Sequence, residues 1–373
     1  MIDVPVPAPS TLKTISPTRA NDLLTCSYRV AWLLDPRYHY LRHPMPGSEL
    51  GTVAHKLVSA VGHGLLYRAK DTTSAETLLN KTWTAFEAEA QNRLQEAWSP
   101  AVVPTASEWR GYHLTRARVI RRALRLFDSR RTQPLNPDQR SAKARVEQPL
   151  ADKSAEIEGR PDRVEGAAGD RCVVDLKTGL EQSEASAGQR RQLLLYAHMV
   201  TVDEGAAPTR IAIEDTSGRR WEERIAPGGI ESAVAQAVDA RTRFNTAARA
   251  GASEQLAVPS PDTCRFCTYR PVCGPFWRAL AVDWQQGSVA GTVTGFEEAA
   301  AGSILRLAAE SPVSDPGEWT VTAVPIHIVP KVGDRVKIVD AEASGATNYL
   351  RWQWRTLFEP NPKGLATTSF GRR

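Results

Sequence analysis

The chain has 373 residues, of which 42% are hydrophobic and 24% charged, a globular composition with room for about two domains. Its net charge of +5 permits a polyanionic partner but does not require one. No run of about 18 uncharged apolar residues is present, and residues 1–13 lack the apolar core of a secretory signal. We therefore expect no membrane span, no secretion and a cytoplasmic location.

The first 140 residues have the pattern of helices. Ser16 is a candidate N-cap, with Pro17 at the first helical position. Further on, apolar residues recur at the spacing of one helix face. They are Leu50, Val53, Ala54, Leu57 and Val61. The predicted helices span residues 16–34, 48–66, 74–98 and 108–128.

From residue 144 onward, strands alternate with helices. Short segments rich in Val and Ile, bounded by turn residues, predict strands, and two longer segments predict helices. The predicted strands span residues 144–150, 155–166, 170–179, 209–216 and 220–226, and the predicted helices span residues 188–202 and 229–250.

Beyond residue 286 the pattern changes again. Candidate strands separated by Gly, Pro and Asp predict a small all-β barrel or sandwich over residues 286–360, with an OB-like barrel as one candidate. These strands span residues 288–296, 304–310, 319–329, 334–342 and 350–358. Residues 361–373 are expected to form a flexible tail.

A hairpin around Gly166 carries the candidate chemistry. A four-residue turn from Gly166 to Arg171 would place Asp162 opposite Asp175, with Cβ atoms about 5 Å apart. Two such carboxylates repel each other unless a cation binds or one is protonated, and their oxygens suit Mg²⁺ or Mn²⁺. Lys177 shares the face of Asp175 and can orient a metal-activated water. The alternative is an edge-strand salt bridge, because an Asp-x-Lys triplet is common.

Other residues are candidates for the same site. His55 is either a third metal ligand or a histidine at a helix interface. Gln192 and Tyr196 lie on one helix face, where they can hold a phosphate, a water or the lysine, or belong to an amphipathic interface. Glu147, on the strand before Asp162, is either an additional acid or a solvated residue.

Basic and aromatic segments offer candidate nucleic-acid contacts. Residues 116–131 hold the densest arginine run, which predicts a solvated helix face or a helix that contacts phosphates. The arginines off its apolar stripe are Arg118, Arg121, Arg122 and Arg125. Trp352 and Trp354 share one face of the last strand, where they either stack on single-stranded bases or fill the β core.

Three of the five cysteines lie close together. Cys264, Cys267 and Cys273 form a C-x2-C-x5-C pattern, which indicates metal ligands rather than disulfides. Four thiolates satisfy either zinc or an iron–sulfur cluster, and the spacing alone does not choose between them. Cys172 lies in an apolar strand, which predicts a core residue.

The ordered motifs resemble the iron–sulfur branch of the PD-(D/E)XK nucleases, the RecB/AddB type that includes CRISPR-associated RecB-like nucleases. The resemblance covers residues 16–278. It lies in a cysteine in the first helix, His55, the G-x-x-D motif ending at Asp162, the sequence Asp175-Leu176-Lys177, the pair Gln192-x-x-x-Tyr196 and the C-x2-C-x5-C pattern. It implies an α/β, restriction-endonuclease-like core with a mixed sheet, a helical N-terminal part and an Fe–S clasp, in a nuclease domain over residues 1–280.

The resemblance also implies a role for each motif residue. The implied ligands of Mg²⁺ or Mn²⁺ are His55, Asp162, Asp175 and the carbonyl of Leu176. Lys177 would activate or position the attacking water, and Gln192 and Tyr196 would complete the site. The implied ligands of a 4Fe–4S cluster, with zinc as the alternative, are Cys26, Cys264, Cys267 and Cys273. Because Cys26 lies so far upstream, the cluster would be a clasp that couples metal binding to folding.

Together these implications predict a metal-dependent DNA nuclease. The expected activity is that of an exonuclease on single-stranded DNA, in DNA processing, repair or phage defence, and a helicase or other nucleic-acid-processing protein is a candidate partner. The alternatives are a catalytically silent DNA-binding module that keeps the fold and an iron–sulfur sensing protein. The intact Asp–Asp–Lys set argues against the silent module.

Overall fold

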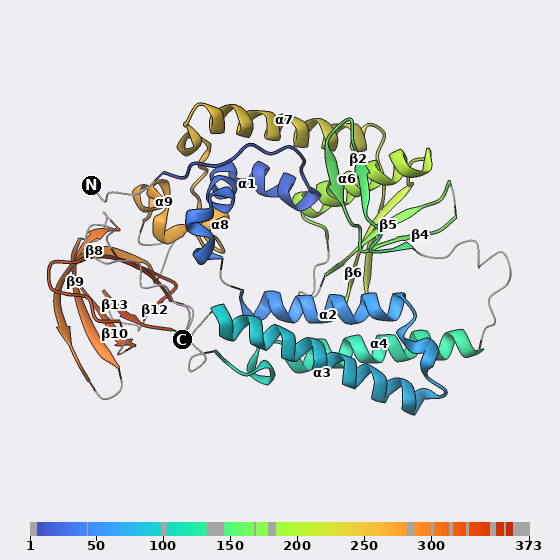
Figure 1. The fold of residues 1–373 in the computed structure, drawn as a ribbon, viewed down its shortest axis with the longest axis horizontal. Helices are drawn as coiled ribbons and strands as arrows, with labels where there is room; N and C mark the ends of the chain where they lie inside the picture. Colours follow the sequence, from blue (N-terminus) through green and yellow to red (C-terminus); the bar gives the residue numbers. More distant parts are fainter. Residues whose placement is uncertain are drawn as a thin grey trace. The chain divides into compact units, whose positions relative to one another are not determined.

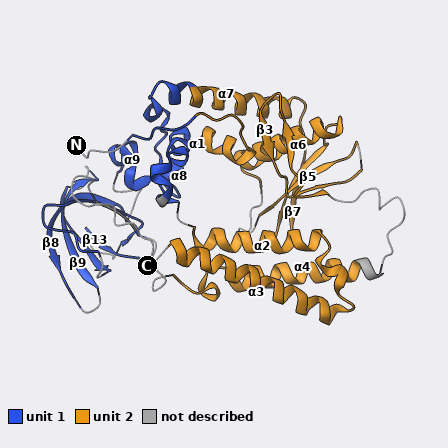
Figure 2. Cartoon of the chain, viewed as in Figure 1, with its two compact units in different colours: residues 1–10, 25–42, 246–373 blue, residues 11–24, 43–245 orange. Residues whose placement is uncertain are grey.

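The computed structural model describes residues 6–42, 44–97, 103–132, 145–167, 169–177, 184–281, 287–299, 302–312, 316–325, 328–343, 348–353 and 356–360. The chain forms two compact units, each built from separate segments of the sequence (Figure 2). Here the sheet–helix unit is residues 11–24 and 43–245, and the cysteine–β unit is residues 1–10, 25–42 and 246–373. The predicted domains, 1–280 and 286–360, divide the chain differently and stay predictions. The predicted tail, 361–373, lies outside the described residues.

Three long helices form one layer of the sheet–helix unit (Figure 1). They are α2 (Pro46–Gly62), α3 (Thr72–Ala97) and α4 (Tyr112–Thr132), with the short 3-10 helices η2 (Leu65–Arg68) and η3 (Ala106–Glu108) between them. Leu57, Leu79 and Trp83 are fully buried in their shared core. The apolar stripe predicted for residues 50–61 is the buried face of α2, so that prediction is confirmed. No helix in the described part of the chain is long and apolar enough to cross a membrane.

A five-stranded mixed sheet lies at the centre of the same unit, in the order β1-β4-β5-β6-β7. Its strands are β1 (Arg145–Val146), β4 (Arg163–Glu165), β5 (Cys172–Lys177), β6 (Arg210–Asp215) and β7 (Arg220–Arg224). Strands β5 and β6 run parallel, and the other pairs are antiparallel. The crossover that parallel strands require contains α6 (Ala187–Glu204). The mixed α/β fold implied by the resemblance is therefore confirmed.

Helices cover both faces of this sheet. Figure 1 shows α6 and α7 (Gly229–Arg249) on one side and the layer of α2, α3 and α4 on the other. Helix α6 begins at Ser186, whose hydroxyl accepts from the N–H of Gln189, and it ends at Gly205 in the left-handed conformation. A sheet covered on both faces explains why β5 is an almost continuous apolar run.

The segment predicted as one strand over residues 155–166 forms two strands in different sheets, so that prediction is wrong. β3 (Ile157–Gly159) pairs with β2 (Leu150–Asp152) in a separate hairpin, whereas β4 joins the central sheet. Pro161 lies at the break and has no N–H to donate to a ladder. As a result Asp162 directly precedes β4.

Helix α1 (Pro17–Leu34) begins as predicted, with the N–H of Arg19 bound to the Ser16 hydroxyl at 3.2 Å. It is interrupted at Cys26, whose φ of −160° and ψ of 95° are extended rather than helical. The chain passes from the sheet–helix unit to the cysteine–β unit between residues 24 and 25. The continuous helix predicted over residues 16–34 is therefore kinked at its cysteine.

The cysteine–β unit contains a seven-stranded sheet in the order β12-β13-β10-β9-β8-β11-β14. Its strands are β8 (Val289–Glu297), β9 (Ser303–Ser311), β10 (Gly317–Val324), β11 (Arg335–Val339), β12 (Glu342–Ala343), β13 (Tyr349–Arg351) and β14 (Leu357–Pro360). Val289, Leu305 and Val321 are buried in its core. The predicted C-terminal β region is confirmed as a sheet, although the strand predicted over residues 350–358 is divided between β13 and β14.

Short helices carry the cysteine segment of this unit. They are α8 (Pro261–Cys264), the 3-10 helix η5 (Arg270–Val272) and α9 (Gly274–Ala279). The buried Arg270 donates to the carbonyl oxygen of Cys267 at 2.8 Å and to Asp340, directly after β11, at 2.5 Å. The Ser311 hydroxyl in β9 donates to the carbonyl oxygen of Trp277 at 3.2 Å. The cysteine segment is therefore bonded directly to the seven-stranded sheet.

Candidate active site and cysteine cluster

The β4–β5 hairpin brings two aspartates together in the predicted register. The pairing of β4 with β5, continued by one residue, places Asp162 beside Asp175. The turn begins at Gly166, which has a φ of +92°. A Cβ atom at Gly166 would lie 2.3 Å from the carbonyl oxygen of Asp170. Only glycine fits there, so this turn fixes the register of the two carboxylates.

Asp162 is surrounded by polar groups. Its Oδ2 accepts from the N–H of Leu176 at 2.6 Å, and its Oδ1 lies 3.7 Å from Nδ1 of His55. Burial raises the pKa of Asp162, and the Asp175 carboxylate raises it further. His55, the Leu176 N–H and Lys177 lower this pKa, but it stays raised. The protein therefore compensates the negative charge of the pair only in part.

Asp175 is 6% exposed, and a donor reaches each of its carboxylate oxygens. Nζ of Lys177 lies 2.8 Å from Oδ2. Nε2 of Gln192 donates to Oδ1 at 3.3 Å. Lys177 therefore projects toward Asp175 from the same strand, as the two-residue spacing predicts.

Helix α6 contributes Gln192 and Tyr196. Burial raises the pKa of Tyr196 to about 12, and the Asp162 and Asp175 carboxylates also raise it. A hydrogen bond with Gln192 lowers this pKa, but by less. Tyr196 is therefore a protonated donor at neutral pH. A Cβ atom at Gly159 would lie 3.0 Å from the Tyr196 ring. The glycine of the G-x-x-D motif therefore lets β3 approach α6 closely.

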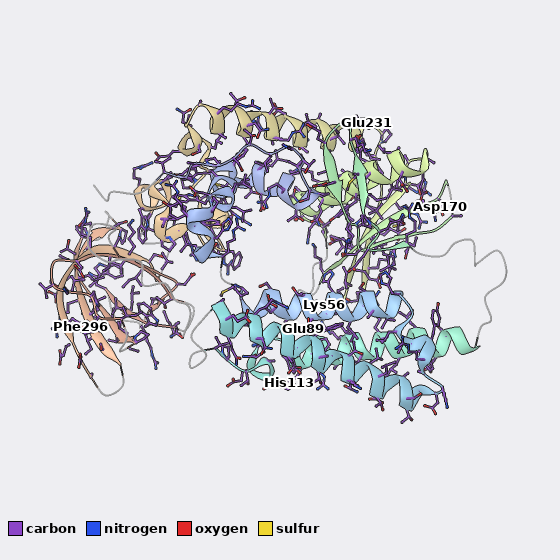
Figure 3. All side chains as sticks on the ribbon, in the orientation of Figure 1. Lys56, Glu89, His113, Asp170, Glu231 and Phe296 are labelled. Atoms are coloured by element: carbon purple, nitrogen blue, oxygen red, sulfur yellow. The ribbon has the colours of Figure 1, made fainter. Side chains whose placement is uncertain are left out.

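His55 lies on α2, whose exposed side forms an ion pair with α3. Nζ of Lys56 lies 2.5 Å from the Glu89 carboxylate of α3, and Figure 3 shows this pair at the facing sides of the two helices. Ser59, one turn after His55, donates from its hydroxyl to Glu147 at 2.8 Å. Sequence reasoning missed Ser59, although its four-residue distance from His55 indicates a shared helix face. Glu147 is thus bonded to α2 rather than simply solvated.

Four predicted side chains gather around the pair of Asp162 and Asp175. They are His55, Lys177, Gln192 and Tyr196. In the ranges that the structure describes, no three or more His, Cys, Asp or Glu side chains are placed to hold a metal ion as they stand. Two carboxylates and an imidazole are nevertheless donors that suit Mg²⁺ or Mn²⁺, and the uncompensated charge of the pair favours a cation.

The arginine run of α4 is partly structural. Arg122 is 8% exposed and forms an ion pair with Glu214 of β6. Arg125 donates to the carbonyl oxygen of Ser217 at 3.1 Å. The prediction that Arg122 lies on a solvated or phosphate-contacting face is wrong, because its guanidinium fills the contact between α4 and the sheet.

The predicted tryptophan pair is only partly described. Trp352 is half-buried against the core of the seven-stranded sheet. Trp354 lies outside the described residues. Base stacking by this pair therefore stays a prediction.

The four predicted cluster ligands all lie in the cysteine–β unit. Cys26 occupies the kink of α1, Cys264 ends α8, Cys267 follows it, and Cys273 is the N-cap of α9. All four are free thiols. Burial raises the pKa of Cys267 to about 11. Burial also raises the pKa of Cys273, and the sulfurs of Cys267, Cys26 and Cys264 raise it further.

The sulfurs of these four cysteines therefore act on one another electrostatically. In the described part of the chain, however, no three of these thiols are placed to hold a metal ion as they stand, so a zinc or iron–sulfur site stays a prediction. Cys172 differs from them. It is 1% exposed in β5, where Nη2 of Arg220 lies 3.1 Å from its sulfur, and it is the core residue that the sequence predicts.

One comparison with known proteins, a family model, agrees with this geometry. No curated protein matches the chain. A crystal structure of a protein from Eubacterium rectale, provisionally designated an exonuclease, is similar with a TM-score of 0.38 and 10% identity, covering 64% of this chain and 82% of that one. The model of the PD-(D/E)XK nuclease superfamily matches residues 14–274, which include every predicted active-site residue and all four predicted cluster cysteines. This match extends over more than half of the sequence, and the chain therefore belongs to the PD-(D/E)XK nuclease superfamily.

Proposed function

We propose that the protein is a metal-dependent DNA nuclease of the iron–sulfur, RecB/AddB-like type. The observation that carries this proposal is the aspartate pair, in which Asp162 lies beside Asp175 and Lys177 lies 2.8 Å from Asp175. Two carboxylates that repel each other, one buried and one half-buried, are a site for a divalent cation, and a lysine beside them is a donor for a phosphate or a water. Membership of a nuclease superfamily supports the same conclusion.

The proposed ligands of Mg²⁺ or Mn²⁺ are His55, Asp162, Asp175 and the carbonyl oxygen of Leu176. When bound, such an ion neutralises charge on the phosphate and acidifies a nearby water. Lys177 carries an ammonium with three donors and no acceptor, so in this state it orients the attacking water and the phosphate. Gln192 holds the Asp175 carboxylate, and the protonated Tyr196 supplies a further donor.

The proposed activity is exonucleolytic hydrolysis of phosphodiester bonds in single-stranded DNA, in DNA processing, repair or phage defence. The test is a time course on single- and double-stranded DNA, labelled at the 5′ or the 3′ end, with Mg²⁺ or Mn²⁺. We expect metal-dependent release of short products from single strands. Asp175→Ala should abolish cleavage, whereas Asp239→Ala, an exposed aspartate of α7, should cut like the parent. Equal cleavage by the parent and Asp175→Ala would remove the assignment.

A 4Fe–4S cluster held by the four cysteines of the cysteine–β unit is the second part of the proposal. The mutual effect of their sulfurs on the Cys273 pKa supports it. Anaerobically purified protein should show iron, sulfide and broad visible absorption, whereas zinc alone would leave the protein colourless. Cys26→Ala should lose the metal as fully as Cys264→Ala does. Cys172→Ala is the matched control and should keep it, because that thiol lies in the core of β5.

We also infer that the seven-stranded sheet is an OB-like barrel. β13 and β14 follow each other in the chain, and they pair with β10 and β11 respectively. Taken as one strand they close the order β8-β9-β10-β13/β14-β11, because β11 pairs back to β8. A closed five-strand order of this kind is the Greek-key barrel of the OB type. An experimental structure in which residues 349–360 do not bridge β10 and β11 would contradict it.

The charge of this region argues against a nucleic-acid role for the barrel. Residues 287–360 contain six Lys or Arg and nine Asp or Glu, whereas the whole chain has a net charge of +5. A net negative charge repels a phosphate backbone. We therefore assign the barrel no contact with phosphates, whereas base stacking by Trp352 and Trp354 stays a prediction.

A further inference from the structure

Glu147 has a backbone conformation that is unusual for a glutamate. It directly follows β1, and its φ of +48° lies in the left-handed region. A side chain with a Cβ atom is unfavourable there, whereas glycine is not. Such a conformation persists where the surrounding contacts hold it, and it is concentrated at functional sites.

Two hydrogen bonds hold Glu147 between the two sides of the candidate active site. Its N–H donates to the carbonyl oxygen of Asp162 at 3.1 Å. Its carboxylate accepts from the Ser59 hydroxyl at 2.8 Å. Ser59 lies on the same face of α2 as His55, one turn further on. Glu147 therefore links α2, the helix that carries His55, to Asp162, the residue that His55 faces.

A neighbouring contact restricts the same helix. A Cβ atom at Gly62 would lie 3.0 Å from Cγ2 of Val146 in β1, so α2 and β1 approach each other closely there. A helix held at both Ser59 and Gly62 has little freedom to tilt one turn earlier, where His55 lies. The contacts at Ser59 and Gly62 therefore help to fix the separation of 3.7 Å between Nδ1 of His55 and Oδ1 of Asp162.

We propose that Glu147 is a positioning residue. Through its bonds to Ser59 and Asp162, it sets the separation of His55 from Asp162 and thereby the affinity of the site for a divalent cation. This inference rests on the proposed function, because it takes His55 and Asp162 as ligands. Removing a contact that orients metal ligands lowers metal affinity or activity by about 10–100-fold.

The experiment measures Mn²⁺ affinity by electron paramagnetic resonance on the full chain without DNA, and Tm without added divalent metal. Glu147→Gly removes the carboxylate but relieves the left-handed backbone. We expect its Tm to be unchanged or raised and its Mn²⁺ affinity to fall about tenfold or more. Ser59→Ala should lose affinity similarly. Glu147→Gln should stay close to the parent, because its amide oxygen still accepts from Ser59.

A matched control is Asn348→Gly, which relieves another left-handed residue, with a φ of +62°, in the cysteine–β unit. Its Mn²⁺ affinity should equal that of the parent. Parental affinity in Glu147→Gly would overturn the proposal, and so would a fall in Tm together with affinity, which indicates a purely structural role. Asp175→Ala distinguishes a failure of the positioning role of Glu147 from a failure of the proposed metal site. If it loses Mn²⁺ while Glu147→Gly does not, only the positioning role fails; if it keeps Mn²⁺, the proposed metal site itself fails.

Discussion

The central sheet carries two acidic positions, at Glu214 and at the Asp162–Asp175 pair, that the protein compensates in different ways. The Glu214 carboxylate forms ion pairs with the guanidinium groups of both Arg122 and Arg163. At the other position, two carboxylates lie together, and the ion-pair partners that the structure describes for them are one lysine and one histidine. Positive charge thus matches or exceeds negative charge at Glu214, whereas negative charge is left over at Asp162 and Asp175.

The side chains of Glu214 and Asp175 point to opposite sides of the sheet. Glu214 pairs with Leu176, which follows Asp175, and neighbouring strand residues point to opposite faces. Glu214 faces α4, which supplies Arg122, whereas Asp175 faces α6, which supplies Gln192. A buried acid with matched arginines holds the layers together, and an acid pair without them is suited to bind a cation. Charge compensation therefore separates the structural cluster from the candidate active site.

The largest expected effect concerns the single ammonium of the candidate site. Lys177→Met should lower the rate of DNA cleavage by roughly 10²–10³-fold, the usual cost of removing one preorganised donor to a reacting phosphate or water. Its Tm should fall, because the buried Asp175 carboxylate loses its cationic partner, so the rates are compared at a temperature where both proteins are folded. Single-turnover cleavage at saturating Mn²⁺ measures the effect. Lys153→Met, at an exposed turn, should cut like the parent. An undiminished rate in Lys177→Met would place this lysine outside the chemistry.

The structural cluster should respond in the opposite way. Arg122→Ala leaves the Glu214 carboxylate short of one buried partner, and breaking a buried ion pair costs roughly 3–5 kcal/mol. We expect the lower end of that range, about 3 kcal/mol, because Arg163 still pairs with Glu214. Denaturant unfolding measures the change. Arg121→Ala, an exposed neighbour, should stay within about 0.5 kcal/mol of the parent. A loss of Mn²⁺ affinity in the folded Arg122 variant would contradict the separation of the two clusters.

The contrast also shows which parts of the molecule local sequence could predict. The aspartate register follows from Gly166, because only glycine fits the turn, and strand pairing then determines which residues face each other. The burial of Arg122 could not be predicted in this way. Its partner Glu214 lies on a distant strand, and only the packing of α4 on the sheet brings them together. The break at Pro161 has a local cause, a missing N–H, but the residues that favour strands on both sides obscured it.

The cysteines and Glu147 mark two further limits. The sequence resemblance grouped Cys26 with the three later cysteines, and the structure places it in the same unit, where its sulfur affects the pKa of Cys273. Four thiols satisfy more than one metal, so the proposed iron–sulfur cluster rests on the resemblance and not on the geometry. The left-handed conformation of Glu147 depends on contacts made by α2, and no local pattern in the sequence indicates it.

The smallest expected effect tests the leftover charge directly. The pKa of Asp162 is raised by burial and by Asp175. From the ordinary value, near 3.8, up to the raised value, the folded protein binds more protons than the unfolded chain, so the free energy of unfolding falls as pH rises through this interval. Above the raised pKa this loss is complete. Without a metal, the ionised Asp162 carboxylate therefore destabilises the fold at a pH above the raised pKa.

Asp162→Asn removes both this titration and the repulsion from Asp175. We expect it to raise the Tm of the metal-free protein at pH 7. A gain of about 1 kcal/mol in the free energy of unfolding would raise the Tm by roughly 2–4 °C for a unit of this size. The gain should shrink as the pH is lowered toward 4, because a growing fraction of the parent carboxyl is protonated. Mn²⁺ should stabilise the parent and not the variant. Asp170→Asn, at the exposed hairpin turn, should show neither effect, and a Tm at or below the parental value in Asp162→Asn at pH 7 would mean that the pair carries no excess charge.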